Sequence, residues 1–217
     1  MAADPDPSPR APKQARSRRT LEALLSACER LLDERAFADV TVKDIVAEAG
    51  SSAGSFYARF ETKYALLHAL HSRMHEGSRA GIQNAVDRLA GRRLAPRRFA
   101  RLLVDAAVRL HSSNAGVLRA VLIESLTDLE FAERGQRLVK DTGAAFAPVL
   151  DAPGVSKARR ARAIESGLLA VMAVLDQELF YGESLLGSSR GRSKPAERIA
   201  RLERIALAAM DLPDPPN

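Results

Sequence analysis

The chain has 217 residues, of which 46% are hydrophobic and 5% aromatic, and it carries a net charge of +6 at pH 7. This length allows one compact domain or two small ones, and the wealth of Ala, Leu and Arg favours helices almost throughout. No apolar run is long enough for a membrane span, no secretory signal is visible, and the single cysteine, Cys28, excludes an internal disulfide. We therefore expect a cytoplasmic protein, and the basic balance suits a polyanionic partner.

The N-terminal segment is rich in Pro and Asp, and residues 1–13 are expected to form a disordered arm. A basic run without acidic residues follows, and it can lie along a DNA groove or remain a solvated tail. An apolar stripe that begins at Leu21 predicts the first helix, from about Thr20 to Arg35. The basic residues of the run are Arg10, Lys13, Arg16, Arg18 and Arg19.

Residues 41–63 have the pattern of two short helices joined by a tight turn. Apolar residues recur at i, i+3, i+4 and i+7 from Val42 to Ala49, which predicts one apolar helix face. Thr41 stands at the N-cap position with Asp44 three residues later, as in a capping box. Gly50 follows the last apolar residue, where a left-handed residue commonly ends a helix.

The second short helix is expected to begin after Ser52, which is placed as its N-cap. Phe56 and Phe60 share one face and are predicted to be core residues, whereas Tyr57 points elsewhere. Thr62 then caps a third, longer helix that extends to about residue 78. This order of elements predicts a helix-turn-helix, whose second helix enters the major groove of DNA.

The side chains on the outer face of the second helix suit contacts with DNA. Ala53 can touch a thymine methyl group, and Ser55 can donate to a base or to a phosphate. The side chains of Tyr57 and Lys63 are long enough to contact phosphate oxygens. The helix start at Thr41 offers a hydroxyl and backbone N–H groups to another phosphate. The predicted DNA-binding residues are Arg18, Arg19, Thr41, Ser51, Ser52, Ala53, Gly54, Ser55, Tyr57 and Lys63.

Residues 49–60 have the sequence A-G-S-S-A-G-S-F-Y-A-R-F and are followed by Lys63. This segment resembles the motif of the tetracycline-repressor-like (TetR) family, which usually has A-G-[apolar]-S-x-G-[ST]-[apolar]-Y-x-x-F and then a lysine. The resemblance covers about residues 14–75, and it departs at Ser51, where a small apolar residue is usual, and at Ala53, which removes one possible base contact.

The resemblance implies an all-α fold with an N-terminal three-helix helix-turn-helix DNA-binding domain, followed by a helical ligand-binding and dimerisation domain. The expected ranges are 1–13 for the arm, 14–75 for the DNA-binding domain, 76–212 for the effector-binding and dimerisation domain, and 213–217 for a disordered tail. The implied function is a repressor that binds a palindromic operator as a homodimer and is released by a small-molecule effector. The alternative is a helical small-molecule-binding protein or enzyme that carries a helix-turn-helix look-alike.

Five further helices are predicted along the rest of the chain. Glycines at 77, 81 and 91 suggest a break, after which helices are expected over about 96–113, 116–127, 128–149, 156–181 and 195–210. The Gly/Ser-rich segment 182–193 is expected to be a mobile loop. The helix after Ser156 is apolar over a wide arc, which indicates burial on two sides, one of them against a second subunit or within the core. The predicted dimer-interface residues are Ile164, Gly167, Leu168, Val171, Leu175, Ile199, Leu202 and Ala206.

The family resemblance also implies that the middle helices enclose an effector site. Its candidate lining residues are Phe99, Leu103, His111, Glu124, Phe131, Phe146, Met172 and Gln177. His68, His71 and His75 lie at i, i+3 and i+7, but a solvated or DNA-proximal helix face is favoured over a metal site there. We find no phosphate-binding loop and no nucleophile with a base partner, so we expect no enzyme activity, no metal and no cofactor.

Overall fold

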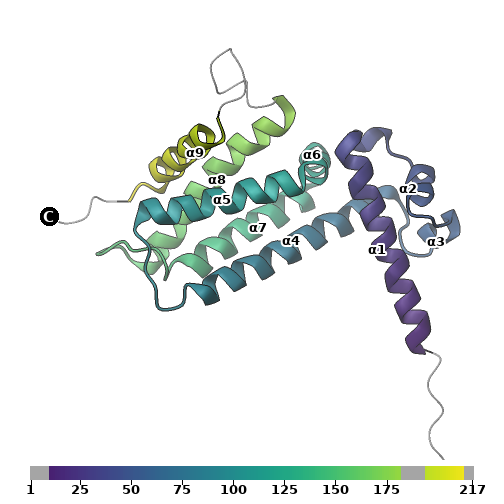
Figure 1. The fold of residues 1–217 in the computed structure, drawn as a ribbon, viewed down its shortest axis with the longest axis horizontal. Helices are drawn as coiled ribbons and strands as arrows, with labels where there is room; N and C mark the ends of the chain where they lie inside the picture. The colour runs from purple at the N-terminus through teal and green to yellow at the C-terminus, as the bar shows by residue number, and fades with distance from the viewer. Residues whose placement is uncertain (1–9, 182–193, 213–217) are drawn as a thin grey trace, which may run out of the picture. The chain divides into compact units, whose positions relative to one another are not determined.

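The computed structural model describes residues 10–181 and 194–212, and within them every regular element is helical (Figure 1). This confirms the all-α fold class. The expected loop at 182–193, the tail at 213–217 and the arm up to residue 9 lie outside the described residues. The helices are α1 (Arg10–Glu34), η1 (Phe37–Asp39), α2 (Val42–Glu48), α3 (Ala53–Tyr57), α4 (Lys63–Arg88), α5 (Pro96–Ser113), α6 (Ala115–Glu124), α7 (Leu129–Phe146), α8 (Lys157–Tyr181) and α9 (Pro195–Met210).

The chain forms two compact units, residues 1–71 and 72–217, and α4 runs from the first into the second. In the first unit, the apolar stripe of α1 is buried together with residues of η1, α2, α3 and the start of α4. Its fully buried side chains include Leu24, Leu32, Ile45, Phe56 and Leu66. This small core fixes the helix-turn-helix on one side and leaves its other side in solvent.

The first helix begins at Arg10, ten residues before the predicted start at Thr20. Residues 10–13 are therefore helical rather than part of a disordered arm. The segment from Ala11 to Arg19 consists mostly of good helix formers, and Pro12 is tolerated because the first turn of a helix needs no N–H donor. The basic run accordingly extends α1 and does not form an extended tail.

Helix α4 is continuous through Gly77 and Gly81, where a break was predicted. Each glycine costs a helix about 1 kcal/mol relative to alanine, which is too little to interrupt a long helix whose neighbours favour it. The chain turns only at Gly91, whose φ of 74° lies in the left-handed region. After this turn, residues 94 and 150 pair in a single isolated parallel bridge.

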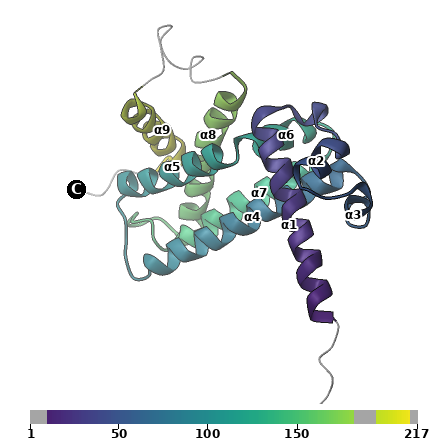
Figure 2. The same ribbon diagram turned by 45° about the vertical axis from the view of Figure 1, so that its right-hand side comes forward.

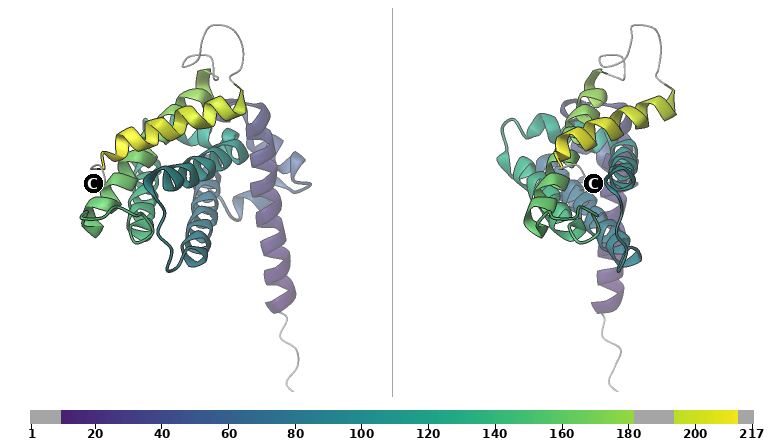
Figure 3. Two further views of the ribbon diagram at one scale, coloured as in Figure 1. Left: turned by 60° about the vertical axis from the view of Figure 1, so that its left-hand side comes forward. Right: turned by 90° about the vertical axis from the view of Figure 1, so that its left-hand side faces the viewer.

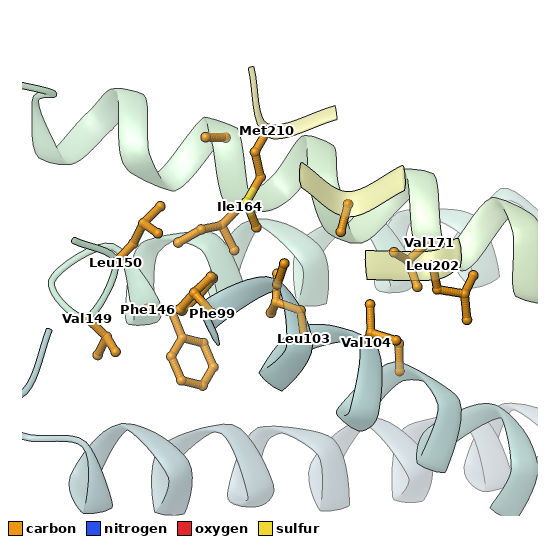
Figure 4. Packing of buried hydrophobic residues seen from close by; sticks show 14 of the residues in the cluster. Phe99, Leu103, Val104, Phe146, Val149, Leu150, Ile164, Val171, Leu202 and Met210 are labelled. Carbon is orange, nitrogen blue, oxygen red and sulfur yellow. The ribbon is translucent and has the colours of Figure 1, made fainter. Parts of the chain in front are cut away.

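The core of the second unit lies between α5, α8, α9 and the end of α7 (Figure 4). Phe99 and Phe146 meet edge to face with their ring centroids 5.8 Å apart, and aliphatic side chains of α8 and α9 cover them. Helices α8 and α9 lie side by side in two further views (Figure 3). Glu178 of α8, only 6% exposed, accepts hydrogen bonds from Arg198 Nε and Arg201 Nη2 of α9, both at 2.9 Å.

Two glycines permit close helix approaches in this unit. A Cβ atom on Gly143 of α7 would lie 2.7 Å from the carbonyl oxygen of Ala161 of α8. A Cβ atom on Gly167 of α8 would lie 2.9 Å from Met210 Cγ and 3.1 Å from the carbonyl oxygen of Ala206, both of α9. The prediction that Gly167 belongs to a dimer interface is therefore corrected, because α9 of the same chain occupies that face.

The same correction applies to most of the predicted interface. The apolar ridge of α8 and its counterparts on α9 fill the core of the protomer itself, so these side chains are not available to a second subunit. Ile164, Val171, Leu175, Leu202 and Ala206 are all buried in this core, and Leu168 and Ile199 pack against it. The wide apolar arc of α8 was correctly predicted, but the part of it that was assigned to a second subunit packs against α9 and α5 of the same chain.

Candidate nucleic-acid interface

Helix α2 is capped by side chains at its start and ends at a left-handed glycine. The Thr41 hydroxyl accepts from Asp44 N at 3.2 Å, and the Asp44 carboxylate accepts from Thr41 N at 2.9 Å, which confirms the capping box. The Thr41 hydroxyl also donates to Asp44 Oδ2 at 2.7 Å. These bonds from Thr41, reinforced by Arg35, lower the pKa of Asp44 to about 2. Gly50 ends the helix with a φ of 56°, as its sequence position predicts.

Helix α3 begins at the predicted cap, since Ser52 Oγ accepts from Ser55 N at 3.2 Å. Phe56 on its inner face and Phe60, which follows the helix, are buried as expected. Its outer face is open to solvent: Tyr57 is 58% exposed and its ring meets that of Phe56 edge to face. The predicted DNA-binding residues Ser52, Ala53 and Gly54 are exposed on this helix, whereas Ser51 and Ser55 are half-buried.

Gly54 is not required by the fold. Its φ is not positive, and a Cβ atom there would meet nothing closer than Ser52 Oγ at 3.9 Å. A glycine in the first turn of an exposed helix lowers helix stability and gains nothing inside this unit. Within this unit, therefore, nothing prevents an alanine at this position.

Arginines outside the predicted site hold the two short helices in place. Arg59 donates from Nη1 to the carbonyl oxygen of Ser55 at 2.8 Å, and from Nη2 to Ser17 Oγ at 3.2 Å, which links α3 to α1. Arg30 of α1 pairs with Glu48 of α2 at 2.7 Å. Sequence reasoning missed these residues because their partners lie far away along the chain, and no local signal identifies them.

Lys63 is bound within the first unit. Its ammonium donates to the backbone carbonyls of Phe37, Ala38 and Val40 at 2.8, 3.2 and 3.0 Å, and it lies 4.6 Å from the centroid of the Phe37 ring. These bonds use the three N–H donors that an ammonium group has. We name this arrangement the Lys63 clamp. A phosphate contact by Lys63, which stays a prediction, would require one of these bonds to exchange.

The basic residues of α1 add an exposed positive surface to the first unit. Arg16, Arg18 and Arg19 are exposed on α1, and Lys43 is exposed on α2. A solvent-facing short helix with small residues, an aromatic hydroxyl and exposed cations has the composition that DNA-binding surfaces use.

Comparisons with known proteins agree with this geometry. Residues 24–70 match the family model described as bacterial regulatory proteins, tetR family. This match assigns residues 24–70 to the N-terminal domain of that family. None of the curated proteins matches the chain in sequence.

Two solved structures share the fold of this chain. One is a TetR-family transcriptional regulator from Mesorhizobium loti, with 16% identity, coverage of 94% of this chain and 96% of that chain, and a TM-score of 0.58. The other is a TetR transcriptional regulator from Rhodococcus sp. RHA1, with 16% identity, coverage of 94% and 100%, and a TM-score of 0.53.

The side chains predicted to line an effector site differ in their exposure to solvent. Phe99, Leu103 and Phe146 belong to the filled core, and Phe131 is also buried. Glu124 and Met172 are half-buried, and Gln177 is exposed. Their role as effector contacts stays a prediction.

His111, another of these candidates, is buried. Its Nδ1 lies 2.9 Å from the carbonyl oxygen of Ala107, and its Nε2 lies 2.9 Å from Asp176 Oδ1 of α8. The ring therefore links α5 to α8.

Among the described helices, none is both long enough and apolar enough to cross a membrane.

Proposed function

We propose that this TetR-family regulator is a cytoplasmic repressor that binds a palindromic operator as a homodimer and releases it when a small-molecule effector binds. The observation that carries the DNA-binding part is the outer face of α3, where Gly54 and Tyr57 are exposed on a helix capped at both ends by its neighbours. A recognition helix of five residues contacts few bases, so a two-fold symmetric pair of them is needed for useful specificity.

We assign the second copy to a different face of α8 from the one predicted. Exposed residues recur on α8 at i, i+3, i+7, i+11 and i+14, a spacing typical of a helix–helix seam, and none of them is charged. Leu169, at 51% exposure, and Phe180 are large apolar members of this face. We name it the Leu169 stripe, and it consists of Ser166, Leu169, Ala173, Gln177 and Phe180.

The homodimer is tested by the mass of the full chain in solution. Leu169→Glu places a charge in the middle of the Leu169 stripe and should convert a dimer into a monomer in light scattering. Leu126→Glu is the matched control, because Leu126 is 83% exposed and lies outside α8. A wild-type monomer at micromolar concentration, or a dimer that survives Leu169→Glu, would refute this assignment.

The operator is tested by selection from random duplexes with the full-length protein, followed by sequencing of the bound pool. We expect an inverted repeat whose half-sites lie one helical turn of DNA apart, or a multiple of it. The Leu169→Glu variant should bind the selected duplex more weakly than the Leu126→Glu variant. A pool without inverted repeats would argue against binding as a symmetric dimer.

A further inference from the structure

Helices α4 and α7 run side by side in the second unit (Figure 2). A cleft of about 250 Å³ is lined by residues of both helices. On α4 the lining residues recur at i, i+3, i+4 and i+7 and form one face. On α7 they lie at i and i+3, on the face that meets α4. The lining residues of this α4–α7 cleft are Ser72, His75, Glu76, Arg79, Arg134 and Arg137.

The cleft has three guanidinium groups and one carboxylate in its lining. Arg79 and Arg137 are half-exposed, and their ion pairs are loose: Arg79 Nε lies 3.9 Å from Asp141, and Arg137 Nη1 lies 3.4 Å from Glu133. Both acidic partners are themselves mostly exposed to solvent. Exposed pairs of this kind contribute little to stability, so a ligand can replace them at small cost. A guanidinium has five N–H donors in a planar fork that matches a carboxylate or a phosphate.

His75 lies at the buried side of the cleft and is only 3% exposed. Burial, followed by the positive charges of Arg134, Arg79 and Arg137, lowers the pKa of His75 to about 4. The lining itself holds three arginines and one acidic residue, Glu76, and the acidic partners of Arg79 and Arg137 lie outside it. A bound anion would take the place of Asp141 and Glu133 as the partner of these arginines.

We propose that the α4–α7 cleft binds a small anionic molecule, a carboxylate or a phosphate, between Arg79 of α4 and Arg137 of α7. The volume is below that of pockets for drug-sized ligands, which favours a molecule of a few carbon atoms or a phosphate group. This names the chemical class of the effector, so its regulatory part rests on the proposed function. Because α4 continues into the unit that carries α3, an anion that ties α4 to α7 can change DNA affinity.

Anion binding is measured first without DNA, by isothermal titration calorimetry of the full chain. Inorganic phosphate and succinate are the two probes, each against sodium chloride of equal ionic strength, so that the preferred anion shows which chemistry the cleft takes. Arg79→Gln and Arg137→Gln should each weaken binding at least tenfold. Arg109→Gln is the matched control, since Arg109 is an exposed arginine on α5 of the same unit. The absence of saturable binding of both probes, or an equal loss in the control, would overturn the site.

The regulatory part is measured separately, as the affinity for the selected duplex with and without saturating anion at constant ionic strength. We expect an approximately tenfold change in the wild type, within the usual range for allosteric coupling, and no change in Arg137→Gln. An anion that binds without changing DNA affinity would refute its role as effector and leave the DNA-binding proposal intact. A chain that fails to bind any duplex would refute the proposed function, while the calorimetry still decides whether the cleft binds anions.

Discussion

The Lys63 clamp makes a prediction that separates a structural role of this lysine from a role in phosphate binding. Lys63→Met keeps the aliphatic stem but removes the ammonium that donates to three carbonyls at 2.8, 3.0 and 3.2 Å. Hydrogen bonds from a charged donor contribute about 1.5–3 kcal/mol each, and here they share one half-exposed group. We therefore expect the free energy of unfolding to fall by roughly 2–4 kcal/mol in total.

Lys63→Arg distinguishes the two roles. A guanidinium binds phosphate at least as well as an ammonium, but its planar fork cannot converge on three carbonyls that surround one point. The clamp predicts that Lys63→Arg also lowers the unfolding free energy, by about half as much as Lys63→Met. The assay is urea denaturation followed by circular dichroism, with DNA affinity measured far below the melting temperature.

The control for both variants is Lys43→Met, which removes an exposed lysine from α2 of the same unit. It should leave stability within about 0.5 kcal/mol of the wild type. If Lys63→Met unfolds at the wild-type urea concentration, the three carbonyl bonds contribute nothing net. The lysine would then be available for a phosphate, as the sequence alone suggested.

Three further predictions concern the packing and titration of named groups. Gly143→Ala should destabilise the protein by about 1–3 kcal/mol in urea denaturation. Gly135→Ala, on the same helix with open space around it, should not destabilise the protein. Equal stabilities of the two variants would contradict the close approach of α7 and α8. Burial, and then the neighbouring charge of Glu29, raises the pKa of the Cys28 thiol to about 12. A thiol reagent at pH 8 should therefore label Cys28 only when urea unfolds the chain. Rapid labelling of the native protein would refute its burial. The pKa of His75 is about 4 in the folded chain and about 6.5 in the unfolded chain, so the unfolded state takes up the proton first as the pH falls. The unfolding free energy should therefore decrease between pH 6.5 and pH 4 by no more than about 3 kcal/mol, and by roughly half of that once solvent screening is included. His75→Gln should remove this decrease.

Local signals predicted the elements of the first unit well. The capping box at Thr41, the left-handed Gly50 and the Ser52 cap depend on residues within three or four positions of each other, so the sequence contains both partners side by side. The starts of α5 and α9 were also predicted well, since a proline lies in the first turn of each helix. Such features depend little on the rest of the fold.

Features that depend on distant contacts were not predictable in the same way. The apolar arc of α8 is visible in the sequence, but which part of it meets α9 and which part faces outward is decided by close packing at Gly167. The Lys63 clamp joins residues more than twenty positions apart, and the burial of His111 depends on Asp176 of another helix. No periodicity or spacing contains that information.

The candidate DNA-binding surface is tested most directly by one comparison of two glycines. Gly54 of α3 and Gly81 of α4 both have room for a methyl group within the protein, so Gly54→Ala and Gly81→Ala should both leave stability unchanged or raise it by up to about 1 kcal/mol. If the outer face of α3 approaches DNA closely, Gly54→Ala should weaken binding to the selected duplex at least tenfold, about 1.4 kcal/mol, while Gly81→Ala binds as the wild type does. Equal affinities of the two variants would contradict the assignment of α3 as the recognition helix.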